Sequence, residues 1–357
     1  MHTNDQTAGR APARPAGNRN TAGTYADLKR RVRELGLLDR QPRFLTYRII
    51  INLLLFAVSV ALMFVSSSLW LQIPNAVFMA FVFGQFSFVA HDVGHRQAYP
   101  TTKANDRVGL LHANLLLGMS FGWWVDKHNA HHAHTNMEDH DPDIDIVALA
   151  FSEKDALEKR GLFRFIVKYQ AFFFFPLLPL QAWSLHVSSV QWLLRPGVKR
   201  RALEAVLLLL HAVLFTWLAV GTLGWLNGLI FLVVQQGLFG LYLASVFAPN
   251  HKGMPVLDND VEIDFMRHQI LTSRNVRPGP LVDIWYGGLN YQIEHHLFPT
   301  LARNRLRQAQ AVVKEFCSQY GIEYYETSLL GSYGEILAHL HEVSAPLRRP
   351  RRAPLTP

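Results

Sequence analysis

Residues 49–90 read IIINLLLFAVSVALMFVSSSLWLQIPNAVFMAFVFGQFSFVA and contain no charged side chain. A helix needs about 20 apolar residues to cross the hydrocarbon core of a bilayer, so this stretch is long enough for two crossings. The segment from Ser66 to Asn75 supplies the turn between them, because it is rich in serine and contains the helix breaker Pro74. The sequence therefore predicts two membrane spans, at 49–67 and 73–90.

A second stretch without charged side chains extends from Ala205 to Asn250. Its break at Gly221–Asn227 divides it into two more predicted spans, at 203–221 and 227–248. The chain of 357 residues is 50% hydrophobic and only 17% charged, below the usual charge content of soluble proteins. One such block is compatible with a buried core helix, but two blocks of this length favour an integral membrane protein.

Basic residues precede each apolar block, whereas the two short turns carry none. They are Arg43 and Arg48 before the first block, and Arg195, Lys199, Arg200 and Arg201 before the second. The positive-inside rule then places both turns away from the cytoplasm, and both termini and the long connector on the cytoplasmic side. The net charge of +8 fits contact with anionic lipid, and basic residues that flank spans argue against nucleic acid as a partner.

The stretch from Tyr169 to Leu194 is also free of charge and contains FFFFPLLP at 172–179. Two prolines so close together are expected to break a helix in mid-membrane. A fifth span would also place the histidines of 128–132 and 295–296 on opposite sides of the membrane. The sequence therefore favours an interfacial or re-entrant segment here.

The two ends of the chain are expected to be disordered, at 1–23 and 346–357, because they are rich in proline and arginine. Between them, residues 24–345 form one domain. It begins with an amphipathic helix carrying Leu28 and Val32 on its apolar stripe, which is expected to lie on the membrane surface. The predicted fold is an all-α integral membrane protein, with four transmembrane helices arranged as two hairpins and a cytoplasmic helical cap.

Three histidine clusters, called here the first, second and third histidine boxes, carry the chemistry. They are HDVGH at 91–95, HNAHH at 128–132 and QIEHH at 292–296. On a helix, spacings of three and four residues place side chains on one face. Seven histidines are more than one tetrahedral zinc ion needs, so the boxes predict two adjacent metals or one very histidine-rich site. Neutral imidazoles suit iron, copper, nickel and zinc.

Other catalytic chemistries have less support. The single Cys317 excludes an internal disulfide, an iron–sulfur cluster and a cysteine-rich zinc site within one chain. The sequence also lacks a phosphate-binding loop and the glycine pattern of a dinucleotide site. The acidic residues Asp141, Asp143 and Asp145 lack the glycine of a calcium loop and are interpreted as a solvated run.

On these motifs the chain resembles the membrane fatty-acid desaturases of the acyl-lipid or acyl-CoA type. The matching residues are HDVGH at 91–95, KHNAHH at 127–132 and GLNYQIEHHLFP at 288–299, within roughly residues 45–345. Gln292 at the first position of the third box resembles front-end desaturases and some bacterial relatives. The resemblance implies an enzyme that uses O2 and two external electrons to place a double bond in a long acyl chain. It also implies a non-haem centre of two iron ions.

The resemblance implies which residues bind the iron. The ligands are His91, His95, His128, His131, His132, His295 and His296, with His251 as an additional ligand after the fourth span. The alternative for His251 is an anchor at the helix end. Gln292 is expected to approach the metal through water or by a weak bond. Four nearby carboxylates are expected to orient the rings, namely Asp92, Glu138, Asp139 and Glu294.

The implied partners are a fatty acyl substrate (acyl-CoA or acyl-lipid), the membrane, and a separate electron donor such as a ferredoxin with its reductase. Basic residues near the boxes are expected to steer an acidic donor, namely Lys127, Lys252, Arg267, Arg274, Arg303 and Arg307. The expected location is a bacterial inner membrane, with the active site on the cytoplasmic side. An alternative in the same chemical class is a membrane di-iron lipid hydroxylase or monooxygenase. A metal transporter is disfavoured, because the boxes flank the spans.

Overall fold

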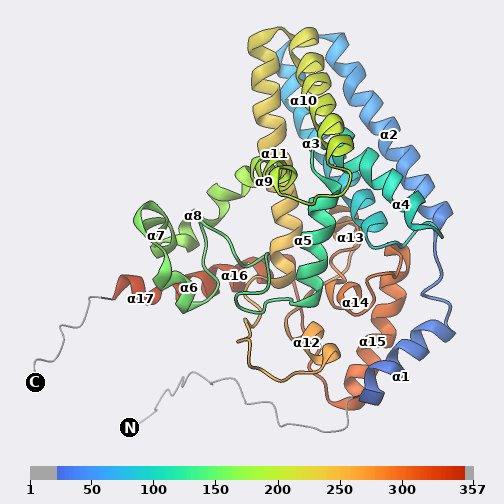
Figure 1. Cartoon of the computed structure of the whole chain (residues 1–357), viewed down its shortest axis with the longest axis vertical. Helices are drawn as coiled ribbons and strands as arrows, with labels where there is room; N and C mark the ends of the chain where they lie inside the picture. The colour runs from blue at the N-terminus through green and yellow to red at the C-terminus, as the bar shows by residue number, and fades with distance from the viewer. Residues whose placement is uncertain (1–21, 350–357) are drawn as a thin grey trace, which may run out of the picture.

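The computed structural model describes residues 22–349, which are mostly helical (Figure 1). The described strands, β1 (Asn275–Val276) and β2 (Glu326–Thr327), form one short parallel pair. The predicted disorder at 1–23 and 346–357 falls mainly on residues outside this range. Within the range, helix α1 (Ala22–Glu34) begins the chain, and α17 (Ala345–Arg348) lies near its end.

Four long helices run side by side in the upper half of Figure 1, and they overlap the four predicted spans. They are α2 (Pro42–Val65), α3 (Leu69–Gly94), α10 (Arg201–Leu223) and α11 (Trp225–His251). Helix α3 packs against both α2 and α11, and α10 packs against α11. Large apolar side chains point outward from α2 and α10, including Leu54, Phe64, Leu209 and Trp217. This outward apolar surface is what a lipid-facing bundle requires.

The length and composition of the helices do not limit the number of membrane spans to four. Within residues 22–349, five helices are long and apolar enough to cross a membrane. The fifth covers Gln170–Leu194 and consists of α8 (Gln170–Leu177), the 3-10 turn η2 (Leu178–Leu180) and α9 (Gln181–Leu194). A helix pair bent by 111° would make a sixth if it counts as one span.

The fifth candidate lies across the bundle. In Figure 1, α9 is seen almost end on, whereas α2, α3, α10 and α11 run up the view. The two prolines interrupt the α-helix as expected, because α8 ends at Leu177, directly after Pro176, and Pro179 lies in the 3-10 turn that separates α8 from α9. Helix α11 accepts this segment closely at Gly240, where a Cβ atom would lie 2.6 Å from the Pro179 carbonyl oxygen.

The remaining helices form a cap at the lower ends of α3 and α11 (Figure 1). Their bounds are α4 (Thr102–Gly109), the π-helix η1 (Leu110–Leu116), α5 (Phe121–Ala133), α6 (Glu153–Glu158), α7 (Gly161–Lys168), α12 (Phe265–Leu271), α13 (Pro280–Tyr286), α14 (Gln292–Leu297), η3 (Arg303–Arg305), α15 (Leu306–Tyr320) and α16 (Leu329–Val343). The helices α5 and α14 carry the second and third histidine boxes, so the cap brings these boxes below the membrane helices.

Helix α1 belongs to this cap and not to the membrane surface. Its apolar residues Leu28 and Val32 are fully buried in a cluster with Phe316 of α15. The Tyr25 hydroxyl also donates a hydrogen bond of 2.7 Å to the Leu297 carbonyl of α14. The prediction of a surface-lying helix is therefore wrong, because the apolar stripe finds a protein partner instead of lipid.

The close packing of α3 on α11 generates the first prediction. A Cβ atom at Gly84 would overlap the ring of Tyr242, which α11 places directly against the α3 backbone. We expect Gly84→Ala to lower the free energy of unfolding by about 1–3 kcal/mol, because the ring has to move within a packed core. Thermal unfolding of the detergent-solubilised chain measures the change. Gly334→Ala is the control, because a Cβ atom there meets open space, and it should leave stability unchanged or slightly raised.

Candidate metal centre

Eight histidines from four separate helices converge at one place below the bundle. His91 and His95 come from the end of α3, and His251 is the last residue of α11. Helix α5 contributes His128, His131 and His132, and α14 contributes His295 and His296. Seven of them form two groups with the geometry to hold a metal ion. The structure thus brings together all eight histidines that the sequence predicts as ligands.

The histidines divide into two adjacent groups. The first group consists of His91, His95, His128 and His295, and the second consists of His131, His251 and His296. Within each group, one potential ligand atom per residue lies within 4.8 Å of the others. His132 bridges the groups, because its Nε2 lies 3.1 Å from His128 Nε2 and its ring stacks on His296 at 4.1 Å between centroids. Two groups side by side are the arrangement that two adjacent metals need, and the metals themselves stay a prediction.

The distances between ring nitrogens suit ligands of a shared ion. The Nε2 atoms of His95 and His128 lie 2.8 Å apart, and those of His131 and His251 lie 3.4 Å apart. Two imidazole nitrogens that bind one metal at right angles lie about 3 Å apart, given metal–nitrogen bonds of about 2.1 Å. The donor set of neutral imidazoles fits iron and other transition metals.

Unpaired buried nitrogens give an independent test of this fit. Both ring nitrogens of His295 and the Nε2 atom of His296 are buried without a hydrogen-bond partner in the described part of the chain. Burying a polar nitrogen without a partner costs free energy, which coordination to a metal ion would recover. The residues present therefore fit a pair of bound metals.

Burial also sets the protonation state that ligation needs. It lowers the pKa of His295 and of His296 well below the usual range, and neighbouring histidines lower each pKa further. Both rings are therefore neutral at pH 7, and a neutral imidazole has the free lone pair that a metal requires.

The second group is held in position by hydrogen bonds at the opposite ring nitrogens. The Nδ1 of His131 lies 2.9 Å from an Asp141 carboxylate oxygen, that of His251 lies 3.0 Å from the Thr272 carbonyl, and that of His296 lies 2.7 Å from the Gln269 side-chain oxygen. When Nδ1 carries the hydrogen in such a bond, Nε2 is left free to bind a metal. These contacts turn three Nε2 atoms toward one point.

Asp141 is the functional residue that the sequence misassigned. Only 2% of its surface is exposed, so the prediction of a solvated acidic run is wrong at this position. Besides contacting His131, its carboxylate accepts hydrogen bonds from the backbone nitrogens of Asn136 and Asp143. Its place in a polar segment shortly after the second box was the available signal.

Of the four carboxylates predicted to orient the rings, only Asp92 lies within ion-pair distance of a box histidine. Asp92 accepts a hydrogen bond of 2.6 Å from Arg303, although its other oxygen lies 3.7 Å from His91 Nδ1. Glu294 accepts from Asn275 and Tyr324, Asp139 pairs with Lys154, and Glu138 accepts from Ser152. The prediction is wrong for Glu138, Asp139 and Glu294, because proximity in sequence does not fix the direction of a side chain.

Gln292 reaches the second group through its amide. The amide nitrogen lies 2.9 Å from His251 Nε2, and the amide oxygen accepts a hydrogen bond of 2.9 Å from Asn250. Gln292 therefore lies beside the second group. Its predicted approach to a metal stays a prediction. Outside the groups, His112 and His211 contact the carbonyls of Val108 and Leu115, as expected of packing residues.

A buried carboxylate fixes the start of the helix that carries the second box. Glu204 accepts hydrogen bonds from the Ser120 hydroxyl at 2.6 Å, the Asn114 amide at 3.1 Å and the Gly122 backbone nitrogen at 3.3 Å. The segment 118–122 reads GMSFG, a Gly-x-Ser-x-Gly pattern also found around nucleophilic serines. Here Ser120 instead caps α5 by accepting a hydrogen bond from the Trp123 nitrogen.

Most of the basic residues predicted to steer an electron donor form ion pairs or hydrogen bonds within the protein. Arg274 is fully buried and pairs with Glu335, and Arg303 is buried against Asp92. Lys127 forms an ion pair with Asp143, and Arg267 forms one with Asp264. Lys252 donates a hydrogen bond to the Asp143 carbonyl. Of the six, Arg307 is exposed without an ion pair among the described residues. The prediction is wrong for Arg274 and Arg303, because cations compensated inside the protein add little field outside it.

The comparisons with known proteins agree on one family. Residues 68–328 match the fatty acid desaturase family. The chain is 32% identical over 339 residues to a Delta(6)-fatty-acid desaturase of Caenorhabditis elegans, covering 90% of this chain and 75% of that protein. It is 33% identical to an acyl-lipid (9-3)-desaturase of Physcomitrium patens, covering 86% of this chain and 60% of that protein. It is 31% identical to a Delta(8)-fatty-acid desaturase of Euglena gracilis, covering 84% and 74%.

The contact between Asp141 and His131 generates the second prediction. Asp141→Asn removes the negative charge that holds the ring, so we expect metal affinity to fall by about 10- to 100-fold. Iron retained per chain after dialysis against chelators of graded strength measures the change. Asp145→Asn is the matched control, because Asp145 is exposed in the same acidic run. Equal retention in the two variants would contradict the role of Asp141.

Proposed function

The chain belongs to the fatty acid desaturase family, and from this premise we propose that it is an oxygen-dependent desaturase with two bound iron ions. The observation that carries the proposal is the pair of histidine groups at the lower ends of apolar helices. In the proposal the substrate is a long fatty acyl chain, carried as acyl-CoA or acyl-lipid. A double bond is formed between two adjacent methylene carbons.

The proposed ligand sets follow the two groups. His91, His95, His128 and His295 hold one iron, and His131, His251 and His296 hold the other. His132 lies between them, and Gln292 approaches the second iron from the side of His251. When bound, the two iron ions activate O2 for removal of hydrogen from unactivated carbon atoms.

The surrounding residues supply position and exclusion of water. Helices α3 and α11 are the most buried of the membrane candidates, and each ends at box residues or at His251. An acyl chain lying along them would reach the histidines from the apolar side. The Trp124 ring stacks on His128 at 4.4 Å between centroids and covers that side of the first group. Such a closed apolar surrounding holds the substrate in one orientation near the metals.

The reaction also needs electrons from outside. Converting CH2–CH2 and O2 to CH=CH and two molecules of water takes up two electrons and two protons. We propose a separate small redox protein, such as a ferredoxin with its reductase, as the source of both electrons. The relatives named above are eukaryotic proteins, so a bacterial inner membrane stays a prediction.

In the proposed topology, α2, α3, α10 and α11 cross the membrane, and α8–α9 lies at its cytoplasmic surface. The transverse direction of α9 in Figure 1 supports this arrangement. The joint contribution of α3, α5, α11 and α14 to one centre requires their box ends on one side of the membrane. Both termini then share that side, which the positive-inside rule assigns to the cytoplasm.

The third prediction tests the function itself. The chain is expressed in a host whose lipids are analysed by mass spectrometry, with the double-bond position mapped. We expect new unsaturated acyl chains and two iron atoms per purified chain. His295→Ala should abolish the product, whereas His140→Ala should not, because His140 is exposed and outside both groups. One metal per chain, zinc as the metal that supports activity, or a hydroxylated product would contradict the proposal.

The fourth prediction tests the topology. Single cysteines are placed at Gly197 and at Gly224 in a Cys317→Ser background, and are labelled from either side of the membrane. Both sites lie in open turns where a side chain meets no neighbour within 4 Å. We expect Gly197→Cys to react from the cytoplasmic side and Gly224→Cys from the opposite side. Reaction of Gly197→Cys only from outside, with Gly224→Cys reacting from the cytoplasmic side, would show that α8–α9 crosses the membrane.

The fifth prediction concerns the electron donor. Attraction between exposed charges weakens over about 10 Å at 0.1 M salt. We therefore expect turnover with an acidic ferredoxin to slow as salt rises, while turnover with a small neutral electron mediator stays constant. Sustained turnover of the pure chain with NADPH alone would contradict the need for a donor protein.

A further inference from the structure

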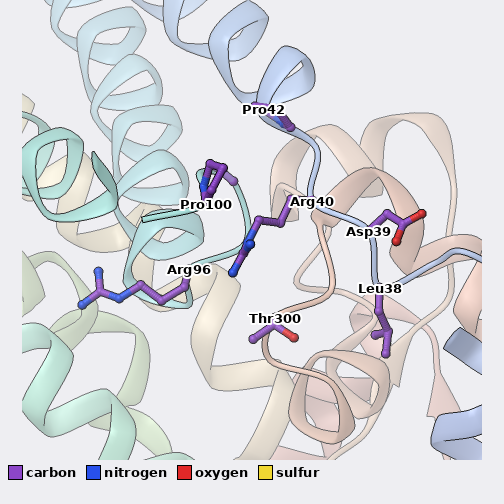
Figure 2. A pocket seen from close by; sticks show the side chains of 8 residues that line it. Leu38, Asp39, Arg40, Pro42, Arg96, Pro100 and Thr300 are labelled. Carbon is purple, nitrogen blue, oxygen red and sulfur yellow. The ribbon is translucent and has the colours of Figure 1, made fainter. Parts of the chain in front are cut away.

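A solvent-open cavity of about 510 Å³ lies where the link between α1 and α2 passes the segment that follows α3. Its lining comes from Leu38, Asp39 and Arg40 on the link, Pro42 at the start of α2, Arg96, Ala98 and Pro100 after α3, and Thr300. Figure 2 shows the Arg40 side chain reaching into the space between Pro100 and Thr300, while Arg96 points away from it. Arg96 instead forms an ion pair of 2.7 Å with Asp106. We call this space the outer cavity.

A much smaller inner cavity adjoins it. The two cavities share Ala98 in their linings, and the consecutive residues Gln41 and Pro42 line one each. The inner cavity has a volume of about 10 Å³. This is roughly the space that one water molecule needs. Its other lining residues include Asp92, Gln97 and Arg303, all of which are buried.

Each of these three residues leaves one polar atom without a partner. Asp92 Oδ1, Gln97 Oε1 and Arg303 Nη2 are buried and form no hydrogen bond in the described part of the chain. Their other polar atoms are well paired. Arg303 Nε donates to Asp92 Oδ2 at 2.6 Å, Gln97 Nε2 donates to the Pro299 carbonyl at 2.9 Å, and Arg303 Nη1 donates to the Gly287 carbonyl at 3.1 Å. The residues are therefore held in position, with three atoms left for another group.

The chemistry of the three atoms selects a neutral ligand. Two are acceptors and one is a donor, which is the complement of a water molecule that donates twice and accepts once. A cation would face the Arg303 guanidinium, and an anion would face the Asp92 carboxylate. A water molecule matches the atoms, their charges and the volume together.

The inner cavity lies beside the first histidine box. Asp92 follows His91 directly, and its Oδ1 lies 3.7 Å from His91 Nδ1. Gln97 lies two residues after His95. The histidines themselves are closely covered, since His91, His95, His131, His251, His295 and His296 are all buried. A molecule formed at the metals needs a polar way out of this enclosure.

We propose that the inner cavity binds an ordered water molecule, and that the two cavities together form the passage through which water leaves the metal centre. The use of the passage rests on the proposed function, because desaturation with O2 releases two water molecules for each double bond. The binding of the water rests on the three unpaired atoms alone. The Asp92–Arg303 ion pair forms one wall of the passage, and Ala98 forms its narrow point.

The water site is tested by a high-resolution structure of the full chain in a lipid nanodisc. We expect density for a water molecule within hydrogen-bond distance of Asp92, Gln97 and Arg303. Gln97→Leu removes one acceptor and should remove or displace this density, while the density at other ordered waters remains. The absence of the water from the natural chain would overturn the proposal, whether or not the protein has desaturase activity.

The passage is tested at its mouth. Thr300 is exposed and lines the outer cavity, so Thr300→Trp should obstruct it without disturbing buried residues. We expect turnover to fall by about threefold or more, with iron content and kcat/KM for the acyl substrate unchanged, because release after the irreversible chemical step becomes limiting. Ser318→Trp is the control, because Ser318 is exposed on α15 and lines neither cavity.

Full turnover in Thr300→Trp would overturn the passage. A failure of the proposed function gives a different result, because the natural chain itself would then form no double bonds or bind no iron. In that case the water density at the inner cavity still decides whether the site exists.

Discussion

The burial of eight imidazoles in one place is the constraint on which the rest of the structure depends. Buried nitrogens that lack partners cost free energy, and neutral rings at close distance gain little from one another. The cluster therefore needs its rings fixed from outside and partners for their inward nitrogens, which in the proposed function are two iron ions. The protein meets the first need with hydrogen bonds from Asp141, Thr272 and Gln269. These bonds link α5, α11 and the segment around α12 to the centre.

The membrane helices serve this centre as well as crossing the bilayer. Helices α3 and α11 are locked together by the packing of Tyr242 on Gly84, and the Tyr242 hydroxyl also contacts Gln85 and the Trp285 carbonyl. Polar side chains inside an apolar bundle are costly unless they pair, and Gln85 of α3 and Tyr242 of α11 pair between helices. The same arrangement sets the relative height of the two helix ends. His91, His95 and His251 consequently meet the cap at one level.

The cap closes the centre and leaves a polar edge. Glu204 fixes the start of α5 from the membrane bundle, and α1 holds α14 and α15 from the opposite side. Most of the cluster is thus enclosed by apolar or fully paired groups. The Asp92–Arg303 pair is the point where charged groups, unpaired atoms and a cavity coincide. A closed histidine cluster and a small polar cavity beside it are compatible in this geometry.

The sequence by itself determined that the centre is built from histidines and that the chain contains long apolar helices. Both can be predicted from local sequence. A long run without charged residues predicts a membrane helix, and a spacing of three or four residues places side chains on one face of a helix. The histidine boxes were recognised in this way, and His251 was identified from the family resemblance. The family resemblance gave them their roles as ligands.

Only the tertiary structure decided how the histidines divide into two groups and which side chains hold them. Asp141 looks like a solvated residue in sequence, because its charge is local information and its burial is not. The stripe of α1 is equally compatible with lipid and with α15, since an apolar face does not specify what covers it. In the sequence, Arg274 and Arg303 resemble surface cations. In the structure they are buried and paired with carboxylates from distant parts of the chain. These features depend on contacts between distant segments, which no local pattern records.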